Sequence, residues 1–190
     1  MQYRRAFLPG GTFFFTVVTA NRKPIFAEQK KVATLREAFC RIRLKRPFEL
    51  DAVVVLPDHL HCIWTLPPGD TDFSTRWRLI KTWFTKRCDL PASGYATLTR
   101  PTAHIIRTEE RRISDAAQAV WQNRYWEHVL RDETDYRRHV EYIHYNPVKH
   151  GYVKTPLDWP HSSFFRYVEA GTYPRDWGGD VREFEGIGRE

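Results

Sequence analysis

Apolar residues along this chain fall into short runs typical of β-strands and longer stretches with the period of a helix. Runs rich in aromatic and β-branched residues predict strands at residues 13–19, 48–56 and 60–66. The second and third of these runs are separated by Pro57-Asp58, a connection short enough for a hairpin. Aromatic residues resume at residues 120–130, and we predict a fourth strand there.

Two stretches repeat their apolar residues every three or four positions, as one buried face of a helix does. The first stretch has them at Val32, Leu35, Phe39 and Ile42. The second stretch has them at Phe73, Trp77, Ile80 and Phe84. Pro47 ends the first helix, because the residue before a proline avoids the helical region. A third helix is expected from residue 134 to about residue 146, with Asp132 or Thr134 as its cap and Pro147 as its end.

The predicted order of elements is β-α-β-β-α-β, followed by a helix and a tail. This is the order of the ferredoxin-like α+β fold, in which the first and third strands lie in the middle of an antiparallel sheet. We therefore expect a single domain over residues 1–190, with a tyrosine-bearing helix after the sheet and a tail at residues 152–190. Residues 91–119 are rich in Pro, Gly, Ser and Thr and then in charge, which predicts an insertion or a mobile loop.

The charge of the chain favours a polyanionic partner. Its 190 residues have a formal net charge of +7 at pH 7, and 15% of them are aromatic. A solvated basic surface would explain the charge alone, but aromatic rings stack on bases, and the combination favours nucleic acid. The candidates for contacts to phosphate are Arg4, Arg5, Arg76, Arg78, Lys81 and Lys149.

Cysteine content and hydropathy indicate a cytoplasmic protein. The chain has three cysteines, an odd number without metal-type spacing, which favours unpaired thiols in a reducing compartment. The apolar run at residues 13–18 is too short to cross a bilayer, and Pro9-Gly10-Gly11 interrupts it. No membrane partner is expected.

Two histidines begin the third predicted strand, at His59 and His61. Residues two apart on a strand point to the same face, so both imidazoles project together while Leu60 points the other way. A strand presents two nitrogen ligands to one metal ion in this way. The same spacing also occurs as two ordinary histidines, so a third ligand has to come from elsewhere in the chain.

The third predicted helix carries Tyr136, Tyr142 and Tyr145. Tyr136 shares an apolar stripe with residues four and seven positions on, so we expect it in the core. Tyr142 lies off that stripe and is followed, one helical turn later, by Asn146, whose amide oxygen can bind a hard metal ion. Tyr145 is followed at the same distance by Lys149, beyond the proline.

The segments around the histidines and tyrosines resemble those of the REP-associated tyrosine transposases of bacteria, which are single-tyrosine HUH transposases. Residues 54–67 (VVLPDHLHCIWTLP) are similar to the metal motif of that family, and residues 142–151 (YIHYNPVKHG) to its tyrosine segment. Supporting similarities are Tyr3-Arg4-Arg5, residues 10–16, residues 125–128 and residues 158–163. The resemblance covers most of the chain outside residues 91–119. Many members have Gln where this chain has Asn146.

The resemblance implies cleavage of single-stranded DNA beside a REP-type hairpin. Tyr142 would attack the phosphate to give a 5′-phosphotyrosine and a free 3′-hydroxyl, with Tyr145 as the rival nucleophile. His59, His61 and Asn146 would hold Mg²⁺ or Mn²⁺, although Zn²⁺ could also bind such a set. Arg138, His139 or the metal would activate the phenol, and His128 would be structural or near the site. The implied protein is a monomer, with a dimer as the alternative, and is associated with the nucleoid.

Two other functions remain open on the residues alone. The fold could recognise a DNA hairpin without cutting it, or a metal-dependent phosphodiesterase could hydrolyse RNA or a nucleotide without a covalent intermediate. His144 is expected to project away from Tyr142, as a surface or packing residue.

Overall fold

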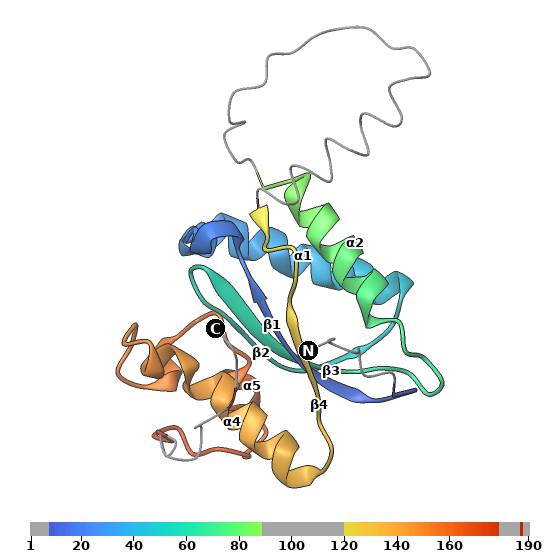
Figure 1. The fold of residues 1–190 in the computed structure, drawn as a ribbon. Helices are drawn as coiled ribbons and strands as arrows, with labels where there is room; N and C mark the ends of the chain where they lie inside the picture. The colour runs from blue at the N-terminus through green and yellow to red at the C-terminus, as the bar shows by residue number, and fades with distance from the viewer. Residues whose placement is uncertain (1–7, 89–119, 179–186, 188–190) are drawn as a thin grey trace, which may run out of the picture.

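A four-stranded antiparallel sheet forms the centre of the molecule, in the order β2-β3-β1-β4 (Figure 1). The computed structural model describes residues 8–88, 120–178 and 187. The strands are β1 (Thr12–Val18), β2 (Glu49–Val55), β3 (His59–Thr65) and β4 (Trp126–Val129). Because β3 and β1 occupy the middle, the predicted ferredoxin-like arrangement is confirmed.

Helices cover both faces of this sheet. The helices are α1 (Gln29–Lys45), α2 (Phe73–Thr85), α4 (Glu133–Lys149) and α5 (Phe164–Glu169). Short 3-10 turns lie at Ala20–Arg22, Ile25–Ala27 and Pro156–Asp158. Figure 1 shows α1 and α2 on one side of the sheet and α4 and α5 on the other. The predicted insertion at residues 91–119 lies outside the residues that the structure describes.

Strand alternation divides the apolar side chains between these two faces. On β1, Phe13 and Phe15 pack with the side chains of α1 and α2, whereas Phe14 packs with those of α4. On β3, Trp64 faces α2 and stacks on Trp77 with ring centroids 4.4 Å apart. The same alternation sends His59 and His61 to the α4 face, where they lie beside a second apolar cluster that includes Phe14 and Ile63.

The first three strands agree with their predicted ranges to within one residue at either end, but the fourth prediction was too long. Residues 120–130 were expected as one strand, whereas β4 covers Trp126–Val129 only. Trp121 forms an isolated bridge with Thr19, and the exposed polar residues 122–124 separate it from β4. The apolar residues before Trp126 resemble a strand in sequence but do not pair continuously with a neighbouring strand. The predicted strand was therefore too long at its start.

Helix α4 begins at its predicted cap but continues past its predicted end. The side chain of Asp132 accepts a hydrogen bond from the Asp135 backbone N–H at 2.8 Å, so Asp132 rather than Thr134 is the cap. Pro147 was expected to stop the helix, yet α4 runs through it to Lys149, and Gly151, whose φ is +72°, follows two residues later. Pro147 removes one backbone donor in the last turns of the helix, but the ladder is still made at its end, where the His150 N–H reaches the Asn146 carbonyl at 3.0 Å.

Burial along α4 is broader than one apolar stripe. Tyr142, expected off the stripe, has 1% of its surface exposed, and His144 is fully buried. Tyr136, expected in the core, is half-buried at its edge. The sheet covers one side of α4, while residues from α5 onward, including Phe164 and Tyr173, cover another side around His144. A helix packed on two sides has to bury polar side chains as well.

Candidate active site

His59 and His61 lie side by side on β3, buried beneath α4. Their ring centroids are 5.0 Å apart. His59 Nδ1 is 2.6 Å from the Asp58 carboxylate, and His61 Nδ1 is 2.9 Å from the Thr16 hydroxyl. These partners engage one nitrogen of each ring and fix its orientation, which leaves Nε2 as the nitrogen for a metal ion.

The acidic partner of His59 stays ionised. Burial alone raises the pKa of Asp58, but the hydrogen bond from His59 and the ion pair with Arg22 outweigh it, and the net pKa lies below its ordinary value. Arg22 Nη1 is 3.0 Å from the Asp58 carboxylate. Asp58 is therefore a carboxylate that holds the proton of His59 on Nδ1.

Tyr142 projects from α4 onto the histidine pair. Its ring centroid lies 5.3 Å from that of His61 and 6.0 Å from that of Phe14. Asn146 follows one helical turn later and is fully buried. The structure thus brings Tyr142 and the two predicted histidine ligands together between β3 and α4, with Asn146 buried one turn further along α4.

Two basic residues join this junction because α4 continues through Pro147. Lys149 Nζ donates a hydrogen bond to the Tyr142 hydroxyl at 3.3 Å and lies 4.9 Å from the centre of the Tyr142 ring. The His150 ring centroid is 5.3 Å from that of His59. Sequence reasoning did not place either residue at the tyrosine or the histidine pair, because it ended the helix at the proline.

His128 and His139, predicted as supporting residues, form a separate group with Asp135. The two rings stack with centroids 4.9 Å apart, and one ligand atom from each of the three residues lies within 4.8 Å of the others. Phe14 stands between this group and the histidine pair, at 4.8 Å from His139 and 5.5 Å from His61. The group is compatible with a divalent metal ion. Arg138 is exposed on α4.

Comparison with known proteins gives this geometry a family context. The chain is 46% identical to the REP-associated tyrosine transposase of Escherichia coli K12 over 184 residues, which are 96% of this chain and 94% of that protein. A Haemophilus influenzae protein that carries the same family name is 38% identical over 178 residues, or 94% of this chain and 93% of its own. The chain belongs to the REP-associated tyrosine transposases.

A solved structure of a REP-associated tyrosine transposase bound to a REP hairpin matches the whole fold. The match has a TM-score of 0.79 and 45% identity, and it covers 100% of this chain and 98% of the other. No family model matches the chain. The family that the motifs indicated, and the α+β fold that the order of elements predicted, are confirmed.

The basic residues predicted to contact phosphate lie in different surroundings within this transposase. Arg76 is 2% exposed and donates to the Asp70 carboxylate at 2.6 Å and to the Pro47 carbonyl at 2.7 Å, so it holds the start of α2. Lys81 packs over the Trp121 and Tyr125 rings, and burial lowers its pKa to about 8. Arg78 is exposed on α2, and Lys149 contacts Tyr142. Arg4 and Arg5 lie outside the described residues.

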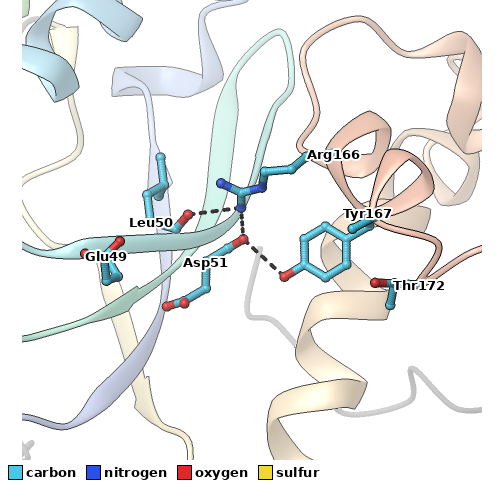
Figure 2. A pocket seen from close by; sticks show the side chains of 7 residues that line it. Glu49, Leu50, Asp51, Arg166, Tyr167 and Thr172 are labelled. Carbon is cyan, nitrogen blue, oxygen red and sulfur yellow. Dashed lines mark hydrogen bonds between the residues drawn. The ribbon is translucent and has the colours of Figure 1, made fainter.

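A cavity of about 350 Å³ lies beside β2, the edge strand at the opposite end of the sheet from β4 (Figure 2). Arg166 and Tyr167 donate to the backbone carbonyl of Asp51, as the dashed lines in Figure 2 show. Burial raises the pKa of Asp51, against the hydrogen bond from Thr65. None of the predicted site residues lines this cavity.

A membrane-spanning segment is not found among the helices that the structure describes.

Proposed function

We propose that this chain is a metal-dependent single-stranded DNA endonuclease and strand transferase that acts at REP-type hairpins. Tyr142 is the nucleophile, and the product is a 5′-phosphotyrosine. The observation that carries the proposal is the contact between Tyr142 and His61, and Asn146, buried one helical turn after Tyr142, supports it. The related transposase solved with a REP hairpin supports the choice of DNA.

His59 and His61 would hold the metal ion through Nε2, and Asn146 through its amide oxygen. The donor set fits, because Asp58 and Thr16 engage the two Nδ1 atoms and Asn146 is buried one helical turn after Tyr142. A nitrogen and oxygen set suits Mn²⁺ or Mg²⁺. Such an ion, when bound, polarises the scissile phosphate and stabilises the leaving oxygen.

Lys149 has the contact needed to activate the nucleophile. A free phenol has a pKa of about 10, so little phenolate exists at neutral pH. A lysine ammonium within hydrogen-bonding distance favours the phenolate, because opposite charges attract. As the Tyr142 oxygen bonds to phosphorus, the bond to the 3′ oxygen breaks, the phenol proton passes to solvent and the leaving oxygen takes up a proton. One phosphodiester replaces another, so rejoining needs no ATP.

Two other functions make different predictions. A hairpin-binding module would bind the DNA tightly and form no adduct. A phosphodiesterase without a covalent intermediate would hydrolyse its substrate through many turnovers in a Tyr142→Phe variant. The buried contact between Tyr142 and His61 favours neither, because neither function requires a tyrosine at the metal ligands.

The deciding experiment combines cleavage with intact-protein mass spectrometry. The wild-type protein is incubated with a single-stranded oligonucleotide that contains a REP-type hairpin, in the presence of Mn²⁺. We expect a mass increase equal to the 5′-linked DNA fragment, which Tyr142→Phe abolishes. Tyr145→Phe is the matched control, since Tyr145 is the neighbouring tyrosine on the same helix, and it should retain the adduct.

Two results would contradict the proposal. An adduct that persists in Tyr142→Phe and disappears in Tyr145→Phe would assign the nucleophile to the other tyrosine. Binding without an adduct across several hairpins, in wild type, would leave the binding module as the function.

An enzyme of this kind would act on chromosomal repeats as a monomer at the nucleoid, and sedimentation with and without the hairpin checks the monomeric state.

A further inference from the structure

The group formed by His128, Asp135 and His139 has the composition and spacing of a transition-metal site. Asp135 and His139 are four residues apart in α4, so they share one helix face, and His128 reaches them from β4. The Asp135 carboxylate lies between the two rings, with one oxygen 3.0 Å from His128 Nε2 and the other 3.1 Å from His139 Nδ1.

These distances are close to those that a bound ion requires. Zinc binds imidazole nitrogen and carboxylate oxygen at about 2.0–2.1 Å, so neighbouring ligand atoms of a tetrahedral site lie roughly 3.3 Å apart. The two nitrogen-to-oxygen distances, which involve different oxygens of the carboxylate, are short of that spacing by a few tenths of an ångström. One ligand atom from each of the three residues lies within 4.8 Å of the others, so rotation of the side chains would bring them to one ion. His139 Nδ1 also lies 2.8 Å from the Asp135 carbonyl, and metal binding would replace that hydrogen bond.

The surroundings give the group both rigidity and access. Phe14 packs on His139, and Trp126 stacks on His128 with ring centroids 5.8 Å apart. The His139 side chain is 6% exposed, whereas those of His128 and Asp135 are about a quarter exposed, at 25% and 23%. An ion can thus enter from solvent at one side of a site whose other side is packed.

We propose that His128, Asp135 and His139 bind a second metal ion of the zinc class, separate from the ion at His59 and His61. Two imidazoles and one carboxylate suit zinc better than magnesium, which prefers oxygen ligands. Three protein ligands leave a fourth position for water. The ion would join β4 to the first turns of α4 and so hold in place the helix that carries Tyr142.

Metal binding, rather than DNA cleavage, tests this proposal, so its outcome does not depend on the proposed function. The protein is stripped with a chelator and titrated with Zn²⁺ by calorimetry, and the spectrum of the Co²⁺ form reports the ligand set. The titration uses a His59→Ala/His61→Ala background, which removes the other site. We expect about one zinc ion per chain to remain bound in that background.

Single substitutions then identify the ligands. Adding His128→Asn to the background should weaken Zn²⁺ binding by at least about 100-fold and abolish the rise in melting temperature that Zn²⁺ produces. His161→Asn is the matched control, since His161 is a half-buried histidine outside both groups, and it should leave the affinity unchanged. Asp135→Asn keeps the shape of the side chain and should also lose the ion.

The proposal is overturned if the His59→Ala/His61→Ala protein, folded by circular dichroism, binds no Zn²⁺. It is equally overturned if its Zn²⁺ affinity is the same with and without His128→Asn. A variant that fails to fold is replaced by His139→Gln, and the melting temperature without metal, compared with that of the background protein, shows whether the fold is intact.

Discussion

The two faces of the central sheet are built from the same four strands but differ in the side chains that they bury. The face beneath α1 and α2 is filled by aromatic rings, including Phe15, Trp64 and Trp77. The face beneath α4 carries His59, His61 and the tyrosine helix. The alternation of side chains along a strand lets one element serve both purposes, because neighbouring residues point to opposite sides.

The difference shows how a rigid site is obtained in a small domain. The apolar face fixes the position and twist of β3 through burial, which supplies most of the stabilising free energy. The histidines on the other face are buried and hydrogen-bonded too, and they also form the candidate site. Substitutions at the histidines should therefore affect chemistry most, whereas substitutions on the face beneath α1 and α2 should affect stability alone.

The largest expected effect is on catalysis, from His61→Ala. Loss of one imidazole ligand should lower the rate of DNA cleavage about 10,000-fold, equivalent to about 5 kcal/mol in the transition state. The melting temperature should fall as well, because the imidazole is fully buried and hydrogen-bonded to the Thr16 hydroxyl, so the rate is measured on protein shown to be folded by circular dichroism. Single-turnover cleavage assays with Mn²⁺ measure the rate. Retained cleavage at more than a tenth of the wild-type rate would remove His61 from the ligand set.

The complementary substitution is Trp77→Ala, on the face of the sheet beneath α1 and α2. Removing this fully buried indole should lower the free energy of unfolding by about 3–5 kcal/mol. Urea denaturation followed by circular dichroism measures the change. The cleavage rate per folded molecule should stay within about threefold of wild type, since Trp77 touches no residue of the candidate site. A collapse of catalysis in the folded fraction would show that the faces are not separable.

A smaller effect on metal binding is expected from Asp58→Asn, because Asp58 is the hydrogen-bond partner of His59 and not itself a proposed metal ligand. Loss of the carboxylate should weaken Mn²⁺ binding by 10- to 100-fold, about 1.4–2.7 kcal/mol. Calorimetric titration of the metal measures it. Arg22→Gln is the control, because it removes the ion pair to Asp58 but keeps the hydrogen bond to His59. Equal losses in both variants would mean that the charge network, not the His59 contact, determines the affinity.

Acidification should destabilise the α4 face through His144. Burial lowers the pKa of His144 from 6.5 to about 3, so the unfolded chain binds a proton between these values that the folded protein does not. Stability therefore falls as the pH drops below 6.5, by up to about 2 kcal/mol near pH 5. Burial also lowers the pKa values of His139 and His161, so the difference between wild type and His144→Gln isolates this residue. Identical pH profiles of unfolding in the two proteins would contradict the prediction.

Much of this arrangement follows from local sequence patterns. Runs rich in aromatic and β-branched residues locate β1, β2 and β3, and the spacing of His59 and His61 puts both on one face. The cap at Asp132 is local as well, since the side chain bonds a backbone group three residues away. These features depend on neighbours along the chain, so the sequence is sufficient to predict them.

The predictions that the structure corrects concern features that depend on tertiary contacts. A proline near the end of a helix predicts a stop, but α4 continues through the buried Pro147, and Lys149 and His150 reach Tyr142 and His59 as a result. The complete burial of Tyr142 requires the sheet to pack against α4. Asp135 was overlooked because His128, its partner on β4, comes near only through the pairing of β4 with β1.

The turn between β2 and β3 has a thermodynamic consequence for metal binding. Asp58 accepts hydrogen bonds from the Thr19 backbone N–H and hydroxyl through its carbonyl, at 2.8 Å each, while its carboxylate holds His59. The turn that closes the hairpin therefore also orients the first ligand, and folding itself brings the two imidazoles together. A metal ion that binds there does not have to order a loop. The conformational entropy of bringing the two histidines together is lost when the chain folds and is not lost again when the ion binds.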